Sequence, residues 1–179
     1  MDLDQLVAEQ PEMFRGIYRI GEPRRKQSPV VFCRENIAGV FREIQVLIEQ
    51  HYEEVAQFKA VQKLDPDWDA YERLEKTGKL WVMTARVDGN LVGYIVMIVG
   101  MHLHYKSLIT ATEDISFLLS AYRKGLTGYK LFSKTAKAMA DLGVQMCVFR
   151  TKALKDHSKL FERLGFEPHD VVYAKILER

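Results

Sequence analysis

The chain has 179 residues, of which 47% are hydrophobic and 28% are charged. These proportions are typical of a soluble globular protein with one sizeable core. The formal net charge of +2 is too small to indicate nucleic acid or an anionic membrane as the main partner. No apolar run is long enough to span a membrane, and the chain does not start with a signal-peptide pattern. Two cysteines, Cys33 and Cys147, form no metal-binding pattern, so the composition favours a cytoplasmic protein.

Residues 1–29 carry few structural signals, and we interpret them as an N-terminal extension that leads into a single domain over 30–179. The segment Pro23-Arg24-Arg25-Lys26-Gln27-Ser28-Pro29 is a basic loop between two prolines. We interpret this loop as a solvated connection rather than a nucleic-acid contact.

The first half of the domain predicts a strand, two helices and a hairpin. We expect a strand over 30–33, a long helix from Ile37 towards Phe58, a second helix from Pro66 to Gly78, and strands over 80–87 and 91–99. Asp88-Gly89-Asn90, between two apolar runs, is a strong hairpin signal. Gly93 predicts a bulge or a close backbone approach in the second strand.

Two groups of polar side chains in this half are candidate substrate contacts. His51, Glu53 and Glu54 cluster near the end of the long helix, and we interpret them as a solvated helix face. His102 and His104 would share one strand face. No third ligand lies at a fitting spacing, so we predict no metal site.

The second half predicts the order strand, turn, helix, strand, helix and strand. We expect a central strand over 109–121, a turn over 122–128, a helix from Gly128 to Gly143, a strand over 144–149, a helix that ends at Gly165, and a strand over 171–177 that closes the sheet. A strand, helix and strand at this spacing favour a right-handed parallel crossover.

The turn from Arg123 to Gly128 has the properties of a phosphate-binding loop. The first turn of a helix has unpaired N–H groups and the positive end of the helix dipole. Glycines allow an anion to approach those groups, and Arg123 and Lys124 add positive charge. The loop is neither a Walker A motif nor a dinucleotide fingerprint. An ordinary strand-to-helix loop with solvated basic side chains remains the alternative for this unit taken alone.

The same unit resembles the core of the Gcn5-related N-acetyltransferase (GNAT) superfamily. The acetyl-CoA loop of that family has the pattern Arg/Gln-x-x-Gly-x-Gly/Ala. Arg123 occupies the first position and Gly128 the last, whereas Leu126 replaces the middle glycine and Gly125 lies one place early. The segment Leu160–Phe166 matches a late helix of the family that ends in Leu-Gly-Phe.

The resemblance covers roughly residues 80–179 and implies an α/β (α+β) fold with a mixed, mostly antiparallel sheet flanked by helices. Its one parallel strand pair, 115–121 with 144–149, would splay apart to hold acetyl-CoA as the co-substrate. The histidines at 102, 104 and 157 resemble those of bacteriophage acetyltransferases, which implies a bacterial or phage-infected cell. The family pattern places the pantetheine arm on the backbone of Phe117, Leu118, Leu119 and Ser120, and the pyrophosphate on Arg123, Lys124, Gly125, Leu126, Thr127 and Gly128.

The implied reaction is transfer of an acetyl (acyl) group from acetyl-CoA to a primary amine, by direct attack in a ternary complex. A protonated amine must lose a proton before it can attack, and a carboxylate can accept that proton. Glu113 and Asp114 lie near the start of the central strand, where enzymes of this family often place a base. Consecutive residues of a regular strand face opposite sides, so we expect only one of them to face the cleft.

The acid that protonates the departing thiolate is less evident. Many members of the family have a tyrosine before the Leu-Gly-Phe triplet, where this chain has Phe161, and Leu154 replaces their usual asparagine. His157, at the start of the same helix, and Tyr173, in the expected last strand, are the candidate acids. His157 could instead face water, and the thiolate could leave unprotonated.

Three hypotheses for function stay open. The first is the N-acetyltransferase, with acetyl-CoA and a small-molecule or protein amine as partners and a possible homodimer. The second is a catalytically weak or inactive GNAT-fold module that binds coenzyme A or regulates another protein. The third is a nucleic-acid contact through Arg24, Arg25, Lys26 and the helix face of Lys130, against which the interleaved acidic residues argue.

Overall fold

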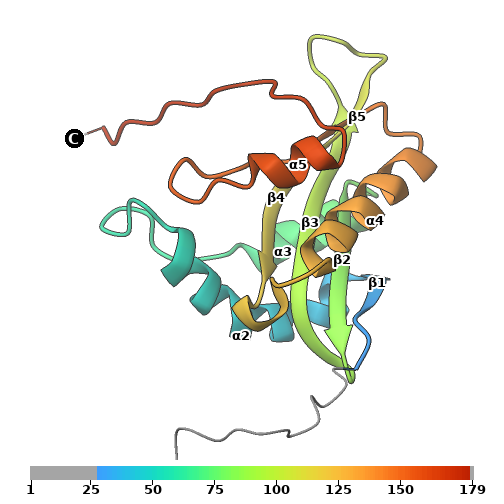
Figure 1. The fold of residues 1–179 in the computed structure, drawn as a ribbon. Coiled ribbons are helices and arrows are strands. Elements are labelled where there is room, and N and C mark those ends of the chain that lie inside the picture. The colour runs from blue at the N-terminus through green and yellow to red at the C-terminus, as the bar shows by residue number, and fades with distance from the viewer. Residues whose placement is uncertain (1–27, 178–179) are drawn as a thin grey trace, which may run out of the picture.

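The computed structural model describes residues 28–177, which form one five-stranded sheet in the order β1-β2-β3-β4-β5 (Figure 1). The strands are β1 (Val31–Glu35), β2 (Leu80–Val87), β3 (Asn90–Met101), β4 (Ile109–Leu118) and β5 (Met146–Val148). The helices are α2 (Ile37–Val55), α3 (Trp68–Lys76), the single 3-10 turn η2 (Ser120–Tyr122), α4 (Thr127–Asp141) and α5 (Ser158–Arg163). The first 27 residues, which contain Arg24, Arg25, Lys26 and nearly all of the expected extension, lie outside the described part of the chain.

The sheet is mixed, as predicted. Strands β1 to β4 pair antiparallel, and β5 runs parallel to β4. The position of the parallel pair was predicted wrongly, because 110–112 of β4 pairs with 146–148 of β5. Strand β4 also ends at Leu118 rather than Ala121, since the chain turns into η2 at Ser120. The second half of β4 therefore lies beyond the parallel ladder.

Each face of the sheet buries its own apolar cluster. Alternate residues along a strand point to opposite faces, and the near-continuous apolar runs of β2 and β3 cover both. Helices α4 and α5 pack on one face through Leu131, Phe132, Met139 and Phe161. Helices α2 and α3 pack on the other face through Ile37, Val40, Ile44, Trp68, Tyr71 and Leu74. Different helices therefore cover the two faces of the sheet beside the place where β4 and β5 stop pairing.

Two glycines shape the hairpin that leads to the site. Asp88 and Gly89 take φ values of 50° and 82°, which the two-residue turn between β2 and β3 requires. Gly93 lies where β3 meets the end of β4, and a Cβ there would lie 2.7 Å from Leu118 Cδ1 and 2.8 Å from the Phe117 carbonyl oxygen. The predicted close approach at Gly93 is confirmed.

Arg86 ties the start of α2 to the sheet. Its guanidinium bonds Glu35 of β1 at 2.7 and 2.8 Å and Glu43 of α2 at 2.7 and 2.8 Å. These charge-assisted bonds hold the pKa of both carboxyl groups below the usual range. They fix the direction in which α2 crosses the sheet, and hence the place where its far end lies.

The predicted last strand is wrong. Residues 167–177 form neither helix nor strand, and the segment runs away from the end of α5 (Figure 1). Val171 is 80% exposed and Tyr173 is 91% exposed. Strand β5 has only three residues, so it offers a short edge for a sixth strand to pair with.

No helix in the described range 28–177 is long and apolar enough to cross a membrane.

We expect Gly93→Ala to destabilise the protein by about 2 kcal/mol, because the added methyl group would push against the backbone of β4. Urea unfolding of the variant and the wild type measures this difference. Gly100→Ala is the matched control, since a Cβ at that strand position meets nothing within 4 Å. Equal loss in both variants would contradict a specific contact at Gly93.

Candidate functional site

The site begins where β4 and β5 stop pairing. The ladder ends at the pair Thr112 and Val148. One residue later β4 bulges: Met97 of β3 pairs with Glu113 and Val96 pairs with Ile115, so Asp114 is left over between them. A bulge bends its strand and is common beside functional sites. Beyond it, the edge of β4 that faces β5 pairs with no strand among residues 28–177.

The side chain of Glu113 occupies the point of divergence. Its Oε2 accepts the backbone N–H of Arg150, just after β5, at 3.0 Å. The carboxylate thus takes the place of the next main-chain acceptor in the ladder. Glu113 is only 6% exposed, and its burial raises the pKa of the carboxyl group against the opposing effects of hydrogen bonds and nearby positive charges. A buried acid of this kind can exchange a proton closer to neutral pH.

Asp114 is held from the other face of the sheet. Its Oδ2 accepts the hydroxyl of Tyr71, in α3, at 2.5 Å. Burial and this bond raise the pKa of Tyr71, so the tyrosine remains a donor. Sequence reasoning did not single out Tyr71, which lies within the expected second helix.

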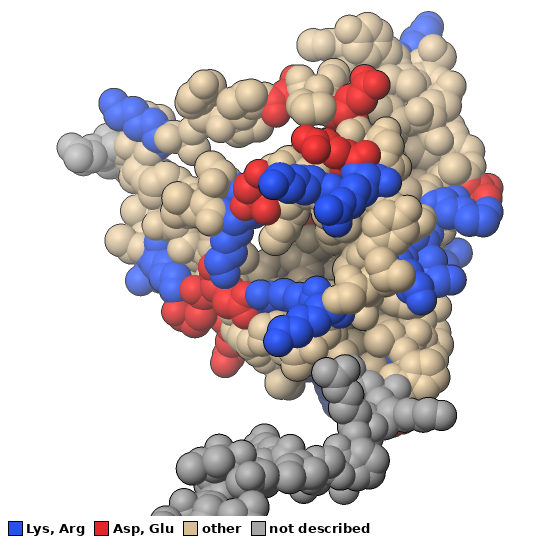
Figure 2. Space-filling view, viewed as in Figure 1, with Lys and Arg blue, Asp and Glu red and all other residues tan. Residues whose placement is uncertain are grey.

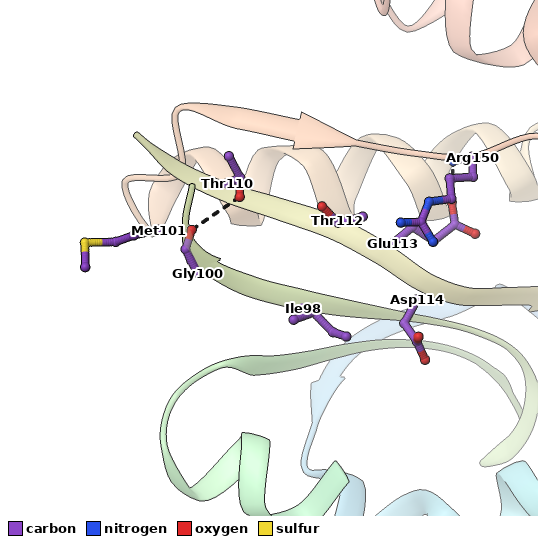
Figure 3. A pocket seen from close by; sticks show the side chains of 8 residues that line it. All are labelled: Ile98, Gly100, Met101, Thr110, Thr112, Glu113, Asp114 and Arg150. Carbon is purple, nitrogen blue, oxygen red and sulfur yellow. Dashed lines mark hydrogen bonds between the residues drawn. The ribbon is translucent and has the colours of Figure 1, made fainter. Parts of the chain in front are cut away.

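The two carboxyl groups line one open pocket of about 360 Å³. In Figure 3, Asp114 points towards the side of α3, whereas Glu113 points towards Arg150. Strand alternation alone predicts that only one of them faces the pocket, and the bulge allows both to border it. The lining residues are Ile98, Gly100, Met101, Thr110, Thr112, Glu113, Asp114 and Arg150.

The start of α4 is open, as a phosphate-binding loop requires. Helix α4 begins at Thr127 with no side-chain cap, and Gly125 before it has a φ of 81°. None of the backbone N–H groups from Lys124 to Tyr129 donates to another described group of the chain. Free amides in the turn before a helix and in its first turn are groups that can bind an anion. Gly143, with a φ of 81°, ends the helix as predicted.

The guanidinium of Arg123 is turned away from these amides. Its Nε donates to the Leu118 carbonyl at 2.6 Å, and its Nη2 lies 2.7 Å from Glu54 Oε2 in α2. Its Cζ lies 5.4 Å from the centroid of the Phe117 ring. Glu54 also lies 3.5 Å from Lys155 Nζ, in the segment between β5 and α5. We call Glu54, Arg123 and Lys155 the clasp, because they join three segments across the divergence.

Figure 2 shows a hollow in the face that carries η2 and α5, with lysine and arginine side chains around its rim and acidic side chains beside several of them. The described segments next to it supply exposed cations: Lys124 after η2, and Lys152, Lys155 and Lys159 around the start of α5. Positive charge at the rim attracts ligands of the opposite sign. The hollow is thus suited to an anionic ligand.

Two predicted site residues do not join the others. His157 is exposed at the start of α5, where its backbone N–H donates to Thr151 Oγ1 at 2.6 Å. Tyr173 lies in the exposed C-terminal segment. Neither lines the pocket of Glu113 and Asp114. Phe161 is 8% exposed and packs against Phe132, Phe149 and Phe166 with ring centroids 5.1 to 6.3 Å apart.

The interpretation of His51 as part of a solvated helix face is wrong. His51 is 9% exposed and stacks on Phe117 with a centroid distance of 5.0 Å. The sequence did contain a signal for this burial. His51 lies seven residues after buried Ile44, a spacing that places both on the same face of α2. Among residues 28–177, no group of three histidine, cysteine or acidic side chains could hold a metal ion.

No family model matches the sequence, and no curated protein matches it. Solved structures do match the fold. An aminoglycoside acetyltransferase from an uncultured soil metagenomic sample, in complex with sisomicin, has a TM-score of 0.64 at 16% identity over 83% of this chain and 97% of its own. The ribosomal-protein-alanine N-acetyltransferase of Brucella melitensis biovar Abortus 2308 has a TM-score of 0.62 at 18% identity, over 84% and 100% of the two chains. An aminoglycoside N-acetyltransferase in complex with CoA has a TM-score of 0.60 at 15% identity, over 82% and 99%. The fold predicted from the resemblance to the GNAT superfamily is confirmed.

Glu113→Gln should make the protein more stable than the wild type at pH 8. Folding raises the pKa of this carboxyl group above its value in the unfolded chain, which is near 4.5. Protonation of Glu113 therefore contributes its full stabilisation when the pH is below that unfolded pKa. That stability is lost as pH rises through the higher folded pKa. The glutamine amide oxygen still accepts the Arg150 N–H and has no charge to bury.

Urea unfolding between pH 4 and pH 8 checks this prediction. The advantage of the variant should vanish towards pH 4. Glu162→Gln, at an exposed position of α5, is the control that should follow the wild type. An advantage of Glu113→Gln that is independent of pH would contradict the role of burial.

Proposed function

We propose that the protein is an N-acetyltransferase that transfers the acetyl group of acetyl-CoA to a primary amine in a ternary complex. The observation that carries the proposal is the run of six free amides, Lys124 to Tyr129, beside the divergence of β4 and β5. The fold is that of solved N-acetyltransferases, one of which was determined with CoA. Separate groups of the chain suit the diphosphate, the pantetheine arm and the acetyl group of this ligand.

The diphosphate fits the amides of Lys124 to Gly128, where the helix dipole and Lys124 favour negative charge. The pantetheine arm fits the edge of β4 from Phe117 to Leu118 and the backbone of Leu119 and Ser120, because no strand in the described part of the chain pairs with that edge. An extended ligand arm can then bond the backbone as an added strand would. Thr127 and Gly128 open α4, and Gly128 leaves the approach free of a side chain.

Acetyl-CoA, when bound, supplies the acetyl group as a thioester. Glu113 is the proposed base, because its raised pKa brings its proton exchange nearer to neutral pH than that of an ordinary carboxyl group. It accepts the proton that the ammonium group must lose before the nitrogen forms its bond to the acyl carbon and the carbon–sulfur bond breaks. Asp114, oriented by Tyr71, has one oxygen free to bind the ammonium group in the pocket.

A coenzyme A-binding or regulatory module with little catalytic activity is the second candidate. One observation favours it: no described side chain at the pocket other than the two carboxyl groups can readily donate a proton to a leaving thiolate. A thiol-release assay over a panel of amines separates the two candidates, because only an enzyme releases free coenzyme A in an amine-dependent way.

Coenzyme A should raise the melting temperature and shift the amide NMR signals of residues 124–129. A ligand at about 100 times its Kd stabilises the folded state by about 2.7 kcal/mol. Pantetheine, which lacks the diphosphate, is the control and should move the signals of β4 without those of the loop. Unmoved loop amides at millimolar coenzyme A would contradict the proposed cofactor site.

Glu113→Gln should lower kcat/KM for the amine by about 100-fold, the usual contribution of a general base. Asp114→Asn should act mainly by raising KM, since it removes a charge that binds the ammonium group. Steady-state kinetics with a reactive amine from the panel measure both effects. Glu53→Gln, at an exposed position of α2, is the control, and full activity in Glu113→Gln would contradict its role as the base.

Glu54→Gln should bind coenzyme A roughly two- to fivefold more tightly than the wild type. In the clasp, Glu54 competes with phosphate for Arg123 and Lys155, and partly exposed ion pairs have about this strength. Isothermal titration calorimetry measures the change. The neighbouring Glu53→Gln is again the matched control, and an unchanged or weaker affinity of Glu54→Gln would contradict the competition.

A further inference from the structure

His51 is a nearly buried imidazole that the proposed reaction does not use. It lies near the end of α2, and its ring stacks on that of Phe117 with planes 19° apart. Phe117 is also the residue whose ring Arg123 approaches. The charged groups that act on His51 are Glu54, Lys152, Arg123 and Lys155, which are the clasp and one neighbour. His51 therefore lies against the part of β4 beyond its pairing with β5, which ends at Thr112.

The hydroxyl of Tyr94 fixes which ring nitrogen of His51 carries the hydrogen. Tyr94 is 0% exposed, and its oxygen lies 3.1 Å from His51 Nδ1. No other described group bonds that hydroxyl. If Nδ1 carried the hydrogen, the buried hydroxyl hydrogen of Tyr94 would have no acceptor, which costs free energy. The hydroxyl therefore donates to Nδ1, and Nε2 of the neutral ring carries the hydrogen.

The Nε2–H group of His51 is bonded to no described group. No buried side-chain nitrogen or oxygen of the described residues lacks a partner, so the small exposed part of the residue includes Nε2. Burial lowers the pKa of His51 to about 4, so the ring stays neutral around pH 7. The structure thus holds a fixed neutral donor with an exposed Nε2, and its ring is stacked on Phe117 of β4.

A neutral N–H donor in such a place suits a carbonyl oxygen. The cations and free amides already offer sites for phosphate, and an N–H donor cannot bind an ammonium group. Along the edge of β4, the carbonyl oxygens of the carrier are the amides of its arm and the thioester itself. A donor preorganised by a buried partner loses little freedom when it binds.

We propose that His51 is a ligand-binding residue whose Nε2–H donates to a carbonyl oxygen of the acyl carrier, with Tyr94 as the residue that positions it. The inference rests on the proposed function, because it assumes that the carrier arm lies along β4. It adds a contact from α2, on the opposite side of the cleft from the amides of α4. The cleft would then bind the carrier at both ends, by charge at the diphosphate and by a neutral hydrogen bond at a carbonyl.

Imidazole ¹⁵N NMR of the wild type tests the tautomer and the contact directly. The free protein should show the Nε2–H tautomer of His51, and acetyl-CoA should shift the signal of that hydrogen. Calorimetry should show that His51→Leu weakens the affinity for acetyl-CoA roughly three- to tenfold, the size of one neutral hydrogen bond. His51→Gln, which keeps a neutral N–H donor, should recover part of the loss, and Tyr94→Phe should lose part of the affinity because both tautomers become accessible. His169→Leu, in the exposed C-terminal segment, is the control.

The outcomes separate this inference from the proposed function. A loss confined to acetyl-CoA assigns the thioester carbonyl, and an equal loss for coenzyme A assigns an amide of the arm. Imidazole signals that stay unmoved while acetyl-CoA binds would overturn this inference alone. A wild-type protein that binds no coenzyme A would overturn the proposed function, and this inference with it. If His51→Leu does not fold, the NMR measurement on the wild type still decides.

Discussion

The hydrogen bond from the Arg150 backbone to the Glu113 carboxylate is the contact around which the site is arranged. Glu113 comes one residue after the last β4 residue of the parallel ladder. It lies at the bulge, where Asp114 is paired with no residue of β3. A side chain that ends a ladder in this way satisfies the next backbone donor at the point where the two strands diverge. Burial at this point raises the pKa of the carboxyl group, whereas the hydrogen bond from Arg150 opposes that rise. The place where the strands diverge and the buried position of the carboxyl group thus belong to the same few residues.

Charged side chains link the segments on either side of the place where β4 and β5 diverge. The start of α4 offers free amides, α2 offers Glu54, and the approach to α5 offers Lys155. The guanidinium of Arg123 bonds Glu54 and the Leu118 carbonyl in this structure. A phosphate ligand would compete for that guanidinium. The position of α2, set at its other end by Arg86, therefore bears on ligand binding as well as on stability.

The sequence and the fold disagree most at the chain's end. Val171 to Leu177 has the β-branched composition of a strand, yet strand pairing depends on a partner edge as well as on composition. Strand β5 provides three residues, and the segment after α5 is exposed. Tyr173, chosen for a strand that does not form, thereby moves away from the pocket. His157 illustrates the same limit, because adjacency to a motif in sequence does not place a side chain in the cleft.

The sequence by itself determined the hairpin at Asp88-Gly89, the close approach at Gly93, the glycine that ends α4 and the free amides that begin it, because each depends on backbone geometry over a few residues. Hydrophobic periodicity likewise predicted the order of helices and strands from β1 to α5, although not the absence of a strand after α5. Only the tertiary structure decided the bulge at Asp114, the partners Tyr71 and Arg150, and the burial of His51. Those contacts join residues 37 to 43 positions apart, and their formation depends on how α2, α3 and β5 pack on the sheet. Local propensity contains no information about such distances, so the chemistry of the pocket emerges only when the chain is folded.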